Sequence, residues 1–420
     1  MYVRKKEKVC IVDGKEAIAI YDFNTRRLYR VGSEVKHFFK QLESGNSLNI
    51  ELLDEKTFNI VKDCLDIGLL ETSEENFLTS DSFNDNINNF IDNDIDVVFC
   101  WLEITSYCNQ KCIHCFMGNE LNKNKLDINS IRIIAKDLSE MGVKKVALTG
   151  GEPTLHPNFL EILDILNEFN FKIIILTNGL NISDEMITKF RQYNVITRIP
   201  LLGLEKTHDR ITGVSGAYKK CFNNINKLKN NSINLTITTT VMELNKNEIE
   251  QIQDIADNLD LDFEKGPIFP IGEAKKNWEL LVTKDYQDIL SNCHDFDFNP
   301  GRSIYSDEHY VNVPSKIKKY VDCGTRNIAI TSSGYYVPCL LLRDSIFSMG
   351  STYNKSIMHL VSEKNDNFRN LQDKMSTNNI TPCNNCETRH ICKGGGCKAV
   401  SYLFNNNIEE KNPHYLKCYY

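Results

Sequence analysis

Three cysteines in one short segment have the spacing of an iron–sulfur cluster site. Cys108, Cys112 and Cys115 form a C-x3-C-x2-C pattern directly after a predicted strand. Three thiolates at this spacing can hold three irons of a [4Fe–4S] cube and leave the fourth iron without a protein ligand. An iron with an open position can bind a cofactor or a substrate directly. The segment is therefore predicted to be a catalytic cluster site.

A structural zinc site is the alternative for the same cysteines. Such sites normally use four ligands arranged in two close pairs. His114 could be the fourth ligand, but it lies between two of the cysteines and would strain a tetrahedral site. The position after a strand therefore favours the cluster over zinc.

Most of the other cysteines are gathered near the end of the chain. A C-x2-C pair alone would also fit a zinc ribbon, but seven cysteines in this order favour two further clusters. The seven are Cys323, Cys339, Cys383, Cys386, Cys392, Cys397 and Cys418. Five more are scattered and are expected to be small buried residues, namely Cys10, Cys64, Cys100, Cys221 and Cys293.

The elements that must position the first cysteines alternate between apolar strands and amphipathic helices. Six such units predict a parallel sheet, either open or curled into a partial barrel. Catalytic groups of such sheets lie at the carboxyl ends of the strands, where the first cysteine segment begins. The strands are expected at 97–104, 144–149, 171–177, 195–202, 234–241 and 261–268.

The start of the chain has a different pattern, with three short strands at 8–12, 16–22 and 26–31 before two helical stripes. This order is typical of a winged helix, although on pattern alone it also fits a generic structural module. The predicted domains are this unit (1–71), a polar linker (72–95), the barrel (96–300) and a cysteine-rich domain (301–420).

Length and composition narrow the class of protein. A chain of 420 residues indicates two or three domains. The 49 basic and 56 acidic side chains give a net charge of −7, which argues against a nucleic-acid partner. No signal peptide and no apolar run of about 20 residues is visible, so a cytoplasmic protein without a membrane partner is expected. Clustered cysteines in that compartment bind metals more often than they form disulfides.

With its glycine-rich partner, the cysteine segment resembles the radical S-adenosylmethionine (SAM) superfamily. The family signature places an aromatic residue after the last cysteine, here Phe116. The resemblance implies that Gly150, Gly151, Glu152 and Pro153, after the second strand, bind the amino group of SAM. Backbone carbonyls and a carboxylate at a strand end can hold such an ammonium. Two residues after the third strand would also line the cofactor pocket, namely Thr177 and Asn178.

This resemblance also implies a reaction. The open iron would chelate SAM, and one electron would cleave the cofactor to a 5′-deoxyadenosyl radical that takes hydrogen from the substrate. A flavodoxin or ferredoxin would supply the electron. The expected fold is α/β, a partial (β/α)6 TIM-like barrel with a winged-helix-like domain before it and an iron–sulfur domain after it.

The C-terminal cysteines resemble the SPASM extension of radical SAM enzymes, which carries two auxiliary clusters. The resemblance assigns Cys323, Cys339 and Cys397 to the nearer cluster, and the distal cluster to Cys383, Cys386, Cys392 and Cys418. One departure is the spacing of Cys392 and Cys397, which are separated by four residues where three are usual. An extra glycine in the segment between them could absorb the difference.

A second departure concerns the nearer cluster, because no fourth cysteine follows Cys323 closely. An open iron there would bind the thiolate of a substrate cysteine and favour a carbon–sulfur bond. Leu340 follows Cys339, whereas anaerobic sulfatase maturases have a catalytic aspartate at that place, so that activity is disfavoured.

The N-terminal unit resembles the PqqD-like peptide-recognition domain, in which a leader peptide adds a strand to a sheet edge. A DNA-binding winged helix is the alternative, but the acidic chain argues against it. The predicted function is a maturase that forms a cysteine-to-carbon thioether in a ribosomally made precursor peptide. Carbon–carbon crosslinking and epimerisation are alternatives, and a non-catalytic electron carrier or redox regulator is a further one. A carrier would need no SAM pocket at Gly150–Pro153.

Overall fold

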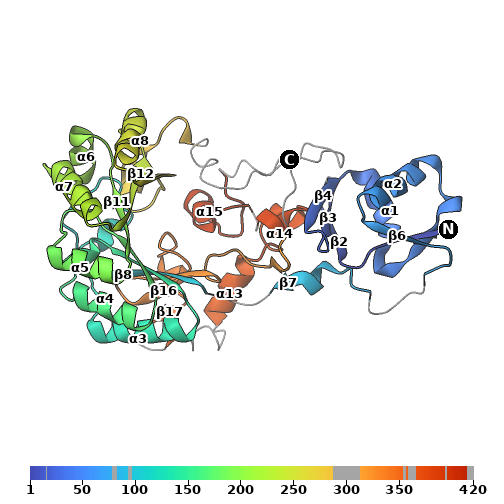
Figure 1. The fold of residues 1–420 in the computed structure, drawn as a ribbon, viewed down its shortest axis with the longest axis horizontal. Helices are drawn as coiled ribbons and strands as arrows, with labels where there is room; N and C mark the ends of the chain where they lie inside the picture. Colours follow the sequence, from blue (N-terminus) through green and yellow to red (C-terminus); the bar gives the residue numbers. More distant parts are fainter. Residues whose placement is uncertain are drawn as a thin grey trace.

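The computed structural model describes residues 1–15, 17–77, 83–92, 97–286, 313–352, 356–357, 366–392 and 395–413. The chain forms an elongated molecule with the barrel at one end, the N-terminal domain at the other and the C-terminal helices between them (Figure 1). Within these ranges, no helix has the length and apolar character needed to cross a membrane.

Six parallel strands form the barrel sheet and pair in their sequence order. Each begins and ends within two residues of the predicted positions, so the prediction of six β–α units is confirmed. The strands are β8 (Phe99–Thr105), β9 (Lys145–Gly150), β10 (Lys172–Leu176), β11 (Ile196–Pro200), β12 (Asn234–Val241) and β13 (Asp262–Pro267).

Amphipathic helices cover the outer side of this sheet (Figure 1). In the first of them, Ile131, Ile134 and Leu138 recur at helical spacing and pack into the main core. Asp127 caps its start by accepting a hydrogen bond from the Ser130 N–H at 2.9 Å. The helices are α3 (Ile128–Glu140), α4 (Phe159–Glu168), α5 (Asp184–Gln192), α6 (Glu205–Thr212), α7 (Ala217–Asn230) and α8 (Ile249–Asn258).

The cysteine-rich segment adds its own strands to the barrel sheet. β15 (Asn327–Ile330) pairs in parallel with β8, and β16 (Tyr335–Val337) and β17 (Gly350–Ser351) follow in antiparallel pairs. These strands are too short for a visible period, so the shared sheet of the ranges 96–300 and 301–420 was not predicted. The helices of this segment are α13 (Asp366–Lys374), α14 (Arg389–Cys392) and α15 (Lys398–Asn405).

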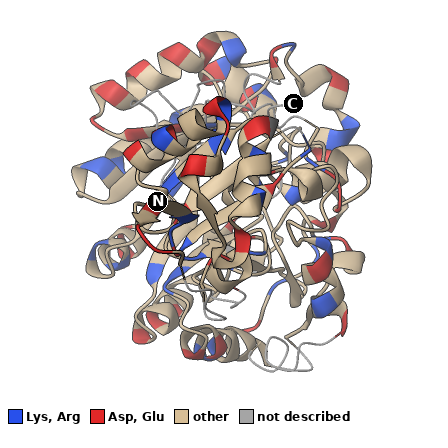
Figure 2. Cartoon of the chain, turned by 90° about the vertical axis from the view of Figure 1, so that its right-hand side faces the viewer, with Lys and Arg blue, Asp and Glu red and all other residues tan. Residues whose placement is uncertain are grey.

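The N-terminal domain contains the three predicted strands as an antiparallel meander, β2 (Val9–Asp13), β3 (Ile18–Asp22) and β4 (Arg27–Val31). A second sheet of three strands was not predicted. It consists of β5 (Ser47–Asn49), β1 (Tyr2–Lys5) and β6 (Leu70–Ser73), and the helices are α1 (Ser33–Gln41) and α2 (Glu55–Asp66). In the view onto this end of the molecule, basic and acidic residues are interspersed along the ribbon (Figure 2).

This domain rests on the last cysteine group, away from the barrel (Figure 1). The Arg30 guanidinium bonds the Glu387 carboxylate at 2.5 Å, and the Tyr21 hydroxyl donates to the Glu387 carbonyl at 3.1 Å. The Lys15 N–H donates to the Asn385 carbonyl at 2.9 Å. The linker is held in turn by β7 (Ile91–Asp92), which pairs with β14 (Ile317–Lys318).

Candidate active site

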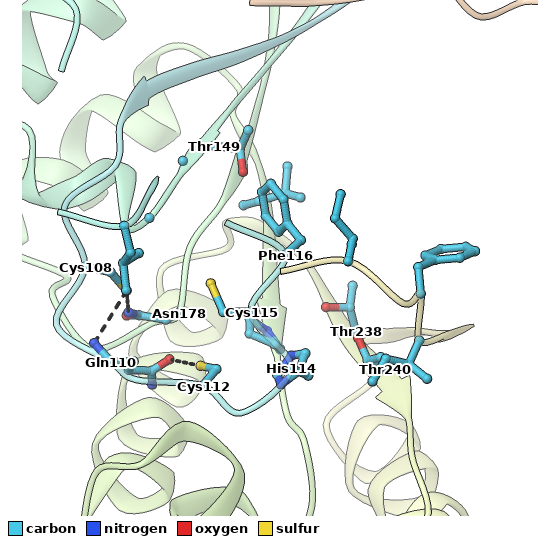
Figure 3. A pocket seen from close by; sticks show the side chains of 18 of the residues that line it. Cys108, Gln110, Cys112, His114, Cys115, Phe116, Thr149, Asn178, Thr238 and Thr240 are labelled. Atoms are coloured by element: carbon cyan, nitrogen blue, oxygen red, sulfur yellow. Dashed lines mark hydrogen bonds between the residues drawn. The ribbon is translucent and has the colours of Figure 1, made fainter. Parts of the chain in front are cut away.

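A cavity of about 460 Å³ opens where the barrel strands end (Figure 3). Most of the predicted cofactor residues line it together, although they come from three separate strand ends. They are Cys108, Cys112, Cys115, Phe116, Gly150, Gly151, Thr177 and Asn178. Ile271, which follows the last barrel strand, lines the same cavity.

Neighbouring backbone fixes the loop that carries the three cysteines. The Cys108 N–H donates to Asn122 Oδ1 at 2.9 Å. Farther along, the Lys111 N–H donates to the Thr212 carbonyl at 2.9 Å and the Ile113 N–H to the Ile211 carbonyl at 3.0 Å. The loop is thus anchored to the end of α6, which holds the thiols over the sheet.

The chemistry of the three thiols suits an iron–sulfur cluster. Burial raises the pKa of Cys108 to about 11 and also raises the pKa of Cys112 and Cys115. Such groups need a cationic centre to become thiolates at neutral pH. Within the described residues, no three His, Cys, Asp or Glu side chains form a group that could hold a single metal ion.

The glycine motif packs directly on the start of the cysteine loop. The Gly151 N–H donates to the Thr105 carbonyl at 2.8 Å, and the Glu152 N–H donates to the Tyr107 carbonyl at 2.7 Å. A Cβ on Gly150, whose φ is +145°, would lie 1.9 Å from the Thr105 carbonyl oxygen. A Cβ on Gly151 would lie 2.4 Å from that of Tyr107. Only glycine permits this approach of two backbones.

Replacing Gly151 by alanine is therefore expected to displace the cysteine loop, because a backbone carbonyl cannot rotate away from the new methyl group. We expect a loss of about 2 kcal/mol in the free energy of unfolding and a lower iron content after reconstitution. Gly32→Ala is the control, since a Cβ there meets nothing within 4 Å. Urea unfolding and iron analysis measure both variants, and equal values would contradict the steric argument.

Glu152 and Pro153 are not among the residues that line the cavity, so their contact with the cofactor stays a prediction. The Glu152 carboxylate is fully buried and accepts hydrogen bonds from Thr154, from the Thr177 hydroxyl at 2.7 Å and from the Asn178 N–H at 2.7 Å. Burial raises the pKa of this carboxyl, and these bonds oppose the shift. Through these bonds Glu152 holds the residues that follow β10 in place.

Asn178 links the third strand end to the cysteine loop. Its Nδ2 donates to Asn109 Oδ1 at 2.6 Å and lies 3.9 Å from the Cys108 sulfur. Its Oδ1 accepts from the Leu180 N–H at 3.0 Å, which fixes the orientation of the amide. Figure 3 shows Asn178 beside Cys108 at one side of the cavity.

Other polar side chains line the cavity without having been predicted, namely His114, Arg198, Thr238 and Thr240. Burial lowers the pKa of His114 to about 4, so its ring is neutral. Arg198 on β11 donates to Glu264 at 2.8 Å. Thr238 and Thr240 are two residues apart on β12 and therefore point the same way. This spacing at the end of a predicted strand is the signal that could have found them.

A buried charge cluster joins the barrel, the cysteine loop and the C-terminal segment. Arg343 forms a two-pronged ion pair with Glu103 on β8, with distances of 2.8 and 3.2 Å. It also bonds Glu120 at 2.6 Å, and its guanidinium lies 5.4 Å from the centre of the Phe116 ring. Both Arg343 and Glu103 are buried. The sequence did not reveal this cluster.

The C-terminal cysteines form two groups. A hydrogen bond with Cys339 and burial raise the pKa of Cys323, and burial raises the pKa of Cys397, with the nearby Cys323 adding to the shift. These three predicted partners therefore lie together. Cys383, Cys386 and Cys392 stand on or beside a short 3-10 helix and α14, and Cys418 lies outside the described residues.

Lys398 is fully buried next to both groups. Burial lowers its pKa to about 8, and the nearby Cys383, Cys392, Cys397 and Cys323 oppose that shift. The scattered Cys10, Cys64, Cys100 and Cys221 are buried, as predicted, and Cys293 lies outside the described residues.

Comparisons with known proteins identify two domains. Residues 102–256 match the Radical SAM superfamily, and residues 322–387 match SPASM, an iron–sulfur cluster-binding domain. The sporulation killing factor maturation protein SkfB of Bacillus subtilis is 25% identical over 60% of this chain. GTP 3′,8-cyclase of Clostridium perfringens is 26% identical over 58% of it. The matches cover 65% of the first relative's length and 81% of the second's.

A solved structure shares the architecture. Streptococcus suis SuiB bound to its precursor peptide SuiA aligns over 99% of this chain and 100% of that one. The TM-score is 0.56 and the sequence identity is 14%, so the likeness is one of fold.

Proposed function

Because this chain is a radical SAM enzyme with a SPASM domain, whose cofactors are SAM and iron–sulfur clusters, we propose that it modifies a precursor peptide made by the ribosome. The observation that carries the proposal is the single cavity shared by the three cysteines, the glycine motif and Asn178. When bound, the cluster and SAM supply a 5′-deoxyadenosyl radical that abstracts hydrogen from the substrate.

The residues of the cavity have distinct roles in this proposal. Cys108, Cys112 and Cys115 hold three irons. The backbone at Gly150 and Gly151 would hold the amino group of SAM, and Phe116, Thr177 and Asn178, which line the same cavity, would complete the wall of its pocket. Glu152 and the buried cluster around Arg343 keep these segments in place.

Two similarities support a peptide substrate. SkfB is a maturation protein, and the likeness to SuiB with its precursor peptide includes the N-terminal domain of this chain. A GTP cyclase is also among the relatives, so GTP is the appropriate control substrate.

We propose a cysteine-to-carbon thioether as the product. Cys323, Cys339 and Cys397 would hold the nearer auxiliary cluster with no fourth protein cysteine beside Cys323, which leaves a position for a substrate thiolate. Cys383, Cys386, Cys392 and Cys418 would hold the distal one. Thioether and carbon–carbon crosslinks both remove two hydrogen atoms from the peptide, but only the thioether consumes the thiol. Epimerisation changes neither.

The test is anaerobic reconstitution of the enzyme with SAM, dithionite and a cysteine-containing precursor peptide encoded near its gene. We expect 5′-deoxyadenosine to form and the peptide to lose two hydrogen atoms together with its reactivity toward iodoacetamide. Intact clusters without 5′-deoxyadenosine would overturn the radical SAM activity itself, and turnover with GTP alone would overturn the peptide substrate. A product that still reacts with iodoacetamide would overturn the thioether. The cytoplasmic location belongs to the same proposal.

We propose that the N-terminal domain binds the leader segment of this peptide along the edge of β4. Among the described residues, β4 pairs only with β3, so its other edge can accept a strand. Tyr29 on β4 is buried, and its hydroxyl has no hydrogen-bond partner in the described part of the chain. A polar group of an added strand would satisfy it.

Tyr29→Phe is therefore expected to weaken leader binding about fivefold, the effect of one lost hydrogen bond of about 1 kcal/mol. Tyr336→Phe is the matched control, because Tyr336 is also buried with an unpartnered hydroxyl but lies in the main core. Fluorescence anisotropy with a labelled leader peptide measures both affinities. Equal dissociation constants would place the leader elsewhere.

A further inference from the structure

We propose that the outer side of the cysteine loop is the docking surface for a small acidic electron-transfer protein. This surface, called here the cluster face, consists of Tyr107, Lys111, Lys123, Lys125 and Leu155. The inference rests on the proposed function, because the first cluster must then receive an electron from a partner.

The cluster face is built on two segments that are bonded to each other. Besides the bond from the Cys108 N–H to Asn122, the Ser106 hydroxyl oxygen accepts from the Lys123 N–H at 2.9 Å. Lys125 bridges to the end of β8. The two lysines therefore stand beside the backbone that leads into the first cysteine, where a partner would come close to the cluster.

The side chains of the cluster face are exposed to solvent. Tyr107 is 44% exposed and Leu155 is 36% exposed, although both are large and apolar. Lys111, Lys123 and Lys125 are exposed, and none of them forms an ion pair with another described residue. Exposed apolar side chains together with unpaired basic ones suit the binding of an acidic partner.

Two of the nearby carboxylates are engaged elsewhere, because Glu120 bonds Arg343 and Glu152 is buried under the loop. Asp127 caps α3 and keeps its negative charge, but the three lysines of the cluster face outnumber it. The chain as a whole carries −7, so the cluster face has the opposite sign to the net charge. An acidic partner is attracted to this basic face. The net negative charge of the molecule disfavours its binding at other surfaces.

Electrons could also enter at the last cysteine group, but the N-terminal domain covers that group. The N-terminal domain bonds Glu387, between Cys386 and Cys392, through Arg30 and Tyr21. The cluster face has no such cover from the described residues, which favours electron entry at the first cluster.

The test compares two charge-reversed holoenzymes, K123E/K125E and K145E/K172E. The second pair is the control, because Lys145 and Lys172 are exposed neighbours at the start of β9 and β10, the opposite end of the barrel. Stopped-flow absorbance follows reduction of the clusters by a reduced flavodoxin and, separately, by a reduced ferredoxin. Iron and sulfide analysis confirms that each variant holds its clusters, and dithionite serves as a reductant that needs no docking.

For K123E/K125E we expect a decrease of about tenfold in the second-order rate constant at low ionic strength, lessening as salt is added. The control pair should differ little from the unmodified enzyme with either donor. 5′-Deoxyadenosine formation with dithionite should be unchanged in both variants. Equal rates for the two variants, or a decrease that salt does not lessen, would overturn the docking surface. Absence of 5′-deoxyadenosine with dithionite in every sample would instead overturn the proposed function.

Discussion

Replacing Cys112 by alanine is expected to abolish 5′-deoxyadenosine formation. Cys112 is a predicted ligand in the middle of the loop, and its loss leaves the first cluster with two protein thiolates. Loss of an outer-shell partner of a bound metal already costs about 10–100-fold, so loss of a ligand should cost more than about a hundredfold. Anaerobic assays with dithionite, together with electron paramagnetic resonance of the reduced cluster, measure the effect.

Cys221→Ala is the matched control for this substitution. Cys221 is buried in the main core, where burial raises its pKa to about 12, and it lies away from the cavity lining. The variant should retain the cluster signal and most of its activity, with only a small loss of stability from the missing sulfur. If Cys112→Ala and Cys221→Ala were equally active, the assignment of the first cluster would be wrong.

Replacing Arg343 by methionine is expected to lower the free energy of unfolding by about 3–5 kcal/mol, because the Glu103 carboxylate would remain buried without its partner. Glu103 is fully buried on β8, and the Ser332 N–H at 3.1 Å would be the main remaining donor. Since Arg343 also holds Glu120 at the end of the cysteine loop, we expect the cluster content to fall as well. Urea unfolding and iron analysis measure the two effects.

Two further variants distinguish the cost of leaving a buried charge without a partner from the cost of losing an exposed ion pair. Arg132→Met breaks an ion pair whose side chains are 51% and 54% exposed, and it should cost less than about 1 kcal/mol. The double variant E103Q/R343M removes both buried charges and should recover part of the lost stability. If Arg132→Met and Arg343→Met lowered the free energy of unfolding by similar amounts, the buried ion pair would stabilise the protein no more than an exposed one.

The periodic parts of the chain were predictable from the sequence. The alternation of strands with amphipathic helices located all six barrel strands, five of which bury apolar side chains. The cysteine spacing and the Gly-Gly pair also indicated residues that meet in one cavity, since the carboxyl ends of parallel strands lie at one edge.

Contacts between distant residues could not be predicted. Glu103 and Arg343 are far apart in the sequence, and nothing in either local pattern indicates their pairing. The motif indicated Glu152, but it did not reveal that the Glu152 carboxylate bonds Thr177 and Asn178, which follow another strand. β15–β17 are too short to show a period, so the sequence did not reveal that they extend the barrel sheet.

The pairing of β15 with β8 has a consequence for biosynthesis. The ribosome completes β8 and the first cysteine loop long before β15 emerges, so one edge of the nascent sheet stays without its hydrogen-bonding neighbour during most of translation. Such an edge is prone to associate with other chains, and contacts between residues so far apart form slowly. Chaperones are therefore needed most in this interval, and a chain truncated before β15 would expose the edge permanently.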